Sequence, residues 1–181
     1  LGEPAAPIPA LVDILDTVAD PSTRDQASAV LVKRVTLEKE ISVPMWRSLG
    51  LLGGKAATDF LMDWVRKGNG REAASASQAL QQRREPAILG FALEIAADPR
   101  SPKEIRGEMF GLVEVIGGVA AREGAIKIIA SDSDEIVRYR AYEAALAAGK
   151  GAAIRPALEA FSATGTYKKD DVVDFLVKDI Q

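Results

Sequence analysis

The 181-residue sequence contains no cysteine and no histidine. Without these side chains it cannot form Cys/His zinc sites, histidine-ligated iron centres, a cysteine nucleophile or a Ser-His-Asp triad. Disulfides are excluded too, but this does not identify the compartment, because many exported proteins also have none. The compartment therefore stays open between the cytoplasm, which we favour, and the periplasm.

The sequence also lacks a strong charge bias and long apolar runs. It carries 23 basic and 26 acidic residues, for a formal net charge of −3. Nucleic-acid binders usually show a basic face, so we expect no nucleic-acid partner. No run of about 18 apolar residues occurs, which predicts no membrane span.

Strand patterns are scarce as well, because no alternation of Val, Ile, Thr or aromatic residues is sustained, whereas helical periodicity recurs throughout. The sequence therefore predicts an all-α protein. Residues 1–9, "LGEPAAPIP", hold three of the nine prolines and are typical of a linker or extended arm. The first residue is not Met, so we expect a processed chain or an excised domain.

A series of apolar positions recurs along the chain at a nearly constant interval, which indicates a repeated structural unit. Its members are Ser28, Leu61, Ala92, Ala125 and Leu158, then Leu31, Trp64, Ile95, Ile128 and Phe161, and then Val32, Val65, Ala96, Ile129 and Ser162. Only the serines in this set are polar. The pattern therefore predicts one helix, A, repeated five times.

A second helix, B, alternates with the first. Ile105, Met109, Leu112 and Ile116 recur at the same interval as Val137, Ala141, Ala144 and Ala148. Glycines follow these helices at Gly53, Gly117 and Gly149, where we expect left-handed residues that end a helix.

These patterns predict a lead helix followed by five antiparallel helix pairs. Residues 1–19 form the arm and lead helix, and residues 20–181 form the repeat array. The lead helix is expected near 8–18, and the pairs at 22–35/43–53, 55–67/70–84, 86–97/102–117, 119–130/133–148 and 150–162/168–180. Single pairs bury too little apolar surface, so stacking is expected to build a right-handed α-solenoid.

The segment "SDSDEIVRYRAYEAALAAGKGAAIRPALEAF" resembles the short bacterial HEAT-like repeat, known also from phycobilisome-lyase-type proteins, and the resemblance extends over roughly residues 20–181. Tetratricopeptide and ankyrin signatures are missing. In the HEAT-like family, the Arg that follows Val in helix B pairs with an acidic turn residue. The resemblance thus implies that Arg138 pairs with Asp132 or Asp134, and Arg106 with Asp98, as structural clamps.

Function in a solenoid is expected on the concave face, which the B helices line. On the side of the B helices opposite their recurring apolar positions, the two middle repeats carry a patch of apolar and charged residues. We predict that it binds a partner through Phe110, Glu114, Tyr139, Arg140, Tyr142 and Leu146. Tyrosine is common at interfaces because it combines a large contact area with a polar tip. The alternative is ordinary core packing, since aromatic residues at helical spacing are often buried.

Other features point less clearly to chemistry. Trp46, Trp64 and Asp63 resemble the aromatic and carboxylate sites of HEAT-like DNA glycosylases, but the chain is acidic. "KKDD" at 168–171 is interpreted as the solvated start of a helix rather than a metal site. "GLLGGKAA" at 50–57 lacks the spacing of a phosphate-binding loop.

The sequence predicts a non-catalytic scaffold or adaptor that binds a protein or peptide and needs no cofactor or metal. The alternative is a bilin-lyase-like enzyme or chromophore-binding chaperone, whose groove would hold a tetrapyrrole. A third hypothesis is a module that self-associates through an end repeat.

Overall fold

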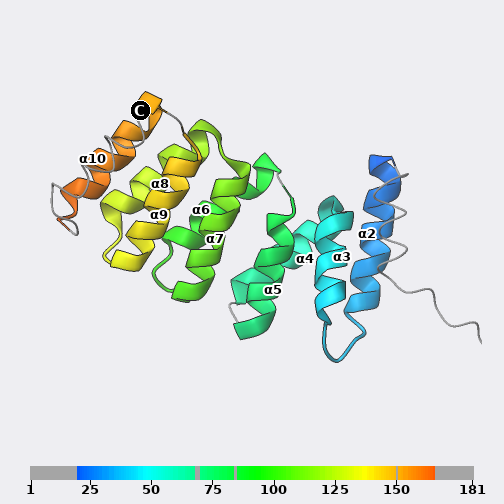
Figure 1. Ribbon diagram of the computed structural model, residues 1–181. Coiled ribbons are helices and arrows are strands. Elements are labelled where there is room, and N and C mark those ends of the chain that lie inside the picture. Colours follow the sequence, from blue (N-terminus) through cyan, green and yellow to red (C-terminus); the bar gives the residue numbers. More distant parts are fainter. Residues whose placement is uncertain (1–19, 68–69, 84, 150, 166–181) are drawn as a thin grey trace, which may run out of the picture. The chain divides into compact units, whose positions relative to one another are not determined.

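A computed structural model describes residues 20–67, 70–83, 85–149 and 151–165 (Figure 1). Within these ranges the secondary structure is helical, with no β-strand. The all-α prediction is confirmed. The chain divides into two compact units between residues 83 and 84.

The described part of the first unit is built from four helices. They are α2 (Pro21–Val35), α3 (Val43–Leu52), α4 (Gly54–Lys67) and α5 (Gly70–Gln81). Helix α4 packs against both α2 and α5, and α3 packs against α5. A Cβ atom at Gly50 would overlap the carbonyl oxygen of Ala79. The absence of a side chain at Gly50 therefore permits the close approach of α3 to α5.

Helix α2 supplies the polar groups that cap the start of α4. Asp25 Oδ1 accepts a hydrogen bond from the Lys55 N–H at 3.2 Å, and Ser28 Oγ accepts one from the Ala57 N–H at 2.8 Å. The first amides of a helix have no partner within the helix, so side chains of another element can satisfy them. This explains why a buried serine occupies a repeat position that is otherwise apolar.

The second unit is built from helices packed in two layers. They are α6 (Pro86–Ala97), α7 (Lys103–Ile116), α8 (Gly118–Ser131), α9 (Glu135–Ala147), the short 3₁₀ helix η1 (Gly151–Ile154) and α10 (Arg155–Ala163). Helices α6 and α7 form one pair and α8 and α9 another; α6 also contacts α8, and α7 contacts α9. Helix α10 packs on α8 and α9. The α7–α9 contact brings the two helices with the predicted binding residues together.

The predicted helix boundaries agree closely with those observed. Between positions 21 and 147 every predicted end lies within a single helical turn of an observed one. The helix predicted at 150–162 begins with the 3₁₀ turn η1, and α10 starts only at Arg155. The lead helix near 8–18, the N-terminal arm and the last helix, 168–180, lie outside the described residues.

The repeat positions form the core. All five members of the first series are buried, as are Leu31, Ile95, Ile128 and Phe161 of the second; Trp64 is half-buried. Helix B positions Ile105, Met109, Val137 and Ala141 are buried too. Apolar side chains at a fixed interval are therefore the ones that the packed helices remove from water.

Two of the three glycine predictions are confirmed. Gly53 and Gly117 end α3 and α7 with φ of 68° and 66°, a conformation strained for residues with a Cβ. The prediction that Gly149 ends its helix with a positive φ is wrong, because the φ of Gly149 is not positive. Helix α9 ends instead in an ordinary αR residue, Ala148. Gly149 leaves room for Arg122, whose Cδ would lie 3.2 Å from an added Cβ.

Candidate functional site

Helix α9, which carries most of the predicted binding residues, begins at a well-capped end. The Asp134 carboxylate accepts hydrogen bonds from the N–H groups of Ile136 and Val137, at 3.0 and 3.2 Å. This capping satisfies amides that lack partners within the helix. The Lys103 ammonium and these N–H groups lower the pKa of Asp134. The ionised carboxylate is thereby favoured at the start of α9, where the helix dipole also stabilises negative charge.

The predicted residues are divided between surface and core. Tyr139 is 40% exposed, Glu114 and Arg140 are exposed, and Leu146 is half-buried. Phe110 and Tyr142, by contrast, are only 1% and 8% exposed. The structure thus leaves four of the six side chains within reach of a partner.

Phe110 belongs to the core and not to the face on which the sequence places it. Helix α7 contacts α6, α8 and α9, so its buried side is wider than one stripe and includes Arg106, Phe110 and Val113. The pattern of Ile105, Met109 and Leu112 marks only one edge of that buried side. On the exposed side of α7, Gly107 has open space where a side chain would be.

Tyr142 is buried because it stacks on Phe161 of α10. The two ring centroids are 4.5 Å apart and the rings are inclined by only 14°. Tyr139 lies at the edge of the same cluster, with its centroid 6.3 Å from that of Phe161 and an interplanar angle of 57°. Aromatic rings in such contact gain stabilisation beyond area burial. Tyr142 is therefore part of the core, whereas the ring of Tyr139 is partly exposed and contacts Phe161 on one side.

Three charged residues of α7 and α9 interact with one another at the surface. Arg140 Nη1 is 3.1 Å from Glu143 Oε2 on the same helix. Burial raises the pKa of Glu114, the nearby Glu143 carboxylate raises it further, and Arg140 opposes the shift. Glu114 of α7 therefore interacts electrostatically with the Arg140–Glu143 pair of α9.

Ile136 also belongs to this surface, although sequence reasoning missed it. Its side chain is 65% exposed, and Tyr139 and Arg140 follow it at the spacing of neighbours on a helix surface. We call Ile136, Tyr139, Arg140, Glu143 and Leu146, together with Glu114, the α9 face. The signal that could have found Ile136 is its spacing, three residues before Tyr139 and four before Arg140.

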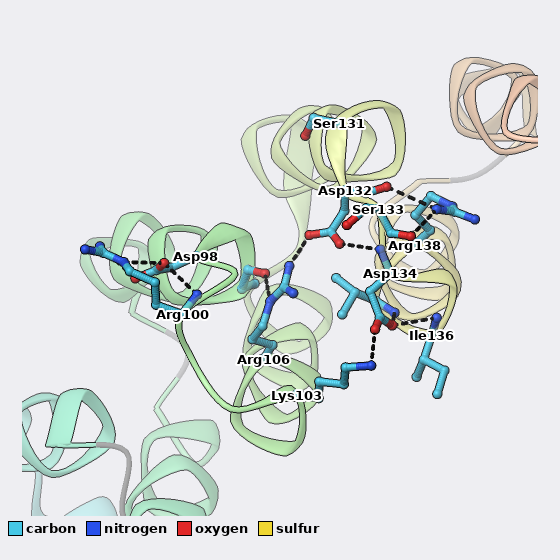
Figure 2. Close-up of polar contacts among 12 residues, drawn as sticks. Asp98, Arg100, Lys103, Arg106, Ser131, Asp132, Ser133, Asp134, Ile136 and Arg138 are labelled. Carbon is cyan, nitrogen blue, oxygen red and sulfur yellow. Dashed lines mark hydrogen bonds and ion pairs between the residues drawn. The ribbon is translucent and has the colours of Figure 1, made fainter.

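A separate polar network joins the start of α7 to the α8–α9 turn (Figure 2). The Arg106 guanidinium, 3% exposed, pairs with the Asp132 carboxylate, and its Nε donates to the Ala96 carbonyl oxygen at 2.7 Å. The prediction that Arg106 pairs with Asp98 is wrong: Asp98 binds Arg100, with 2.9 Å between Oδ1 and Nε. The physical reason is that the Arg106 guanidinium bridges the Ala96 carbonyl at the end of α6 and the Asp132 carboxylate of the next helix pair, while Arg100 binds Asp98.

Arg138 is also placed differently from the expectation. Its Nη1 donates to the carbonyl oxygens of Asp132 and Ser133, at 3.1 and 3.0 Å. The Asp134 carboxylate pairs instead with Lys103 of α7. Both arginines thus bind the α8–α9 turn, as Figure 2 shows. Arg106 binds the side chain of Asp132, whereas Arg138 binds the backbone carbonyls of the turn.

The tryptophans of the first unit form an aromatic cluster. Trp46 is 5.6 Å from Trp64 and 6.1 Å from Phe60 between ring centroids. Asp63 forms an ion pair with Lys67 at 2.5 Å, and the Lys67 ammonium lies 5.3 Å from the centroid of the Trp64 ring. These contacts account for Asp63 and Trp64 without a base-binding role. The "KKDD" segment lies outside the described residues.

No protein-family model and no curated protein sequence matches this chain. The HEAT-like resemblance therefore stays a prediction made from the repeat itself. Within the ranges that the structure describes, no helix combines the length and apolar character needed to cross a membrane.

Proposed function

We propose that the protein is a non-catalytic scaffold of HEAT-like helical repeats and that the α9 face binds a protein or peptide. The regular burial of the repeat positions and the two-layer packing of α6 to α9 support this interpretation. In a repeat array of this kind, successive B helices provide one extended surface. The proposal includes the right-handed solenoid arrangement predicted from the sequence.

The observation that carries this proposal is the setting of Tyr139. Its ring is 40% exposed, yet it is fixed at the edge of the aromatic cluster with Phe161 and Tyr142. A side chain that is already ordered loses less entropy when a partner binds. Ile136 and Leu146 extend the apolar surface, and Glu114 and Arg140 border it with charges of both signs.

A photo-crosslinking amino acid at position 139 tests this proposal directly. The matched control places the same amino acid at Lys127, an exposed residue of α8 in the same unit. With extract from the source cells, we expect a discrete cross-linked product from position 139 and none from position 127. Identical products from both positions, or none from either, would contradict the proposal.

Two tyrosine variants separate binding from folding. Tyr139→Ala should abolish capture of the cross-linked partner while lowering the free energy of unfolding by no more than about 1 kcal/mol. Tyr142→Ala should cost about 3 kcal/mol or more, because it removes a buried ring from the core. If Tyr139→Ala unfolds the protein instead, Tyr139 is a packing residue and the α9 face loses its anchor.

A further inference from the structure

The first unit contains a cavity of about 320 Å³ that is separate from the α9 face. It lies between the loop that precedes α3, the start of α3 and the first turns of α5. Ile41, Val43 and Trp46 supply apolar surface, and Glu40, Arg71 and Glu72 supply charge. Small-molecule sites have this character, with apolar walls and a few polar groups that fix orientation.

The apolar wall of the cavity is held in place by the core. Trp46 is 3% exposed, and its ring contacts both Phe60 and Trp64 of α4. Ile41 is half-buried and Val43 is 61% exposed. A ligand that covers Ile41 and Val43 would gain hydrophobic contact beside the fixed Trp46 ring.

The three charged side chains have no hydrogen bond or ion pair with the residues that the structure describes, whereas charged residues of α4 in the same unit do. On α4, Lys55 pairs with Asp59 and Lys67 with Asp63, each at 2.5 Å. Glu40, Arg71 and Glu72 thus present two carboxylates and one guanidinium beside an apolar wall. These groups are free to bind charges that a ligand brings.

We propose that this cavity binds a free basic α-amino acid, such as lysine or arginine. Such a molecule carries two cationic groups and one carboxylate, which is the complement of Glu40, Glu72 and Arg71. Its aliphatic stem matches Ile41, Val43 and Trp46. Arg71 can hold the carboxylate with two parallel hydrogen bonds, which favours a planar acceptor over a single charge.

Other ligand classes leave one of the charges without a partner. A diamine has no group for Arg71, an apolar amino acid leaves one carboxylate unpaired, and an acidic amino acid brings a second negative charge toward Glu40 and Glu72. A volume near 320 Å³ is at the lower end of the range for ligand pockets, about 300–1,000 Å³, and so favours a molecule of amino-acid size.

Isothermal titration calorimetry of the full chain with L-lysine and L-arginine at low salt tests the inference. We expect saturable binding of one molecule per chain. L-lysinamide, which lacks the carboxylate, and L-leucine, which lacks the side-chain cation, should each bind about tenfold more weakly or worse. If neither basic amino acid binds, or if lysinamide binds as tightly as lysine, the proposal is overturned.

Two substitutions assign the contacts. Glu72→Gln and Arg71→Gln should each weaken binding of L-lysine about tenfold or more, and Arg71→Gln should remove the preference for lysine over lysinamide. The matched control is Arg47→Gln, which changes an exposed arginine of α3 that does not line the cavity. Equal losses in Arg71→Gln and Arg47→Gln would show that the loss does not come from a contact inside the cavity and would overturn the assignment. Far-UV circular dichroism confirms that each variant is folded.

Discussion

The buried Arg106–Asp132 pair gives a sharp test of how the second unit is held together. Arg106 is 3% exposed and Asp132 is 8% exposed. Replacing Arg106 by Met leaves the Asp132 carboxylate buried without its cation and removes the hydrogen bond to the Ala96 carbonyl. Breaking a buried ion pair from one side costs about 3–5 kcal/mol. We therefore expect Arg106→Met to lose about that much of the free energy of unfolding.

A double-mutant cycle separates the pair from its surroundings. Asp132→Asn still accepts the Asp134 N–H, which the carboxylate binds at 2.8 Å, but it leaves Arg106 buried with an uncompensated charge. The double variant Arg106→Met/Asp132→Asn has neither buried charge, so its loss should fall well short of the sum of the single losses. We expect a coupling energy of about 2 kcal/mol.

Urea denaturation followed by far-UV circular dichroism measures these losses. The matched control is the cycle of Arg100→Met and Asp98→Asn, a pair of the same two residue types in which Arg100 is exposed and Asp98 is half-buried. Exposed pairs interact weakly in water, so its coupling should lie within experimental error. A coupling below about 0.5 kcal/mol for Arg106 and Asp132 would refute the clamp.

Two further predictions follow from the helix ends and the close approaches. Asp134→Ala should lower the free energy of unfolding by about 1 kcal/mol at neutral pH. Because the folded protein lowers the pKa of Asp134, this difference from the parent should persist above about pH 5 and shrink as the pH falls through the lowered pKa. Urea denaturation at a series of pH values measures it. A difference that is constant with pH would contradict this. Gly50→Ala should lower the free energy of unfolding by about 1–3 kcal/mol, since its Cβ would overlap the Ala79 carbonyl. The control Gly90→Ala, which has open space around the added Cβ, should stabilise α6 by about 0.5–1 kcal/mol. Equal shifts of the urea midpoint in the two variants would refute the close packing.

The sequence alone determined where the helices lie and which row of apolar residues forms part of each buried face. Most of the apolar positions that recur at a nearly constant interval proved to be core positions, although Val32, Trp64, Ile116 and Ala148 are only half-buried. Helix ends were predicted from Asp, Pro and Gly at the turns. These signals are local, because periodicity and capping depend on close neighbours in the chain. The HEAT-like family, the partner and the scaffold function stay predictions.

The width of each buried face depended on the tertiary structure. Phe110 and Tyr142 are buried because α9 covers one side of α7 and Phe161 of α10 stacks on the second tyrosine. Ile136 stays exposed since no described helix covers it. The charges of Arg106 and Asp132 are both visible in the sequence, but their pairing depends on how one helix pair packs on the next. The same holds for the cavity beside Trp46, whose charges come from segments that are distant in the sequence and meet only when α3 packs against α5.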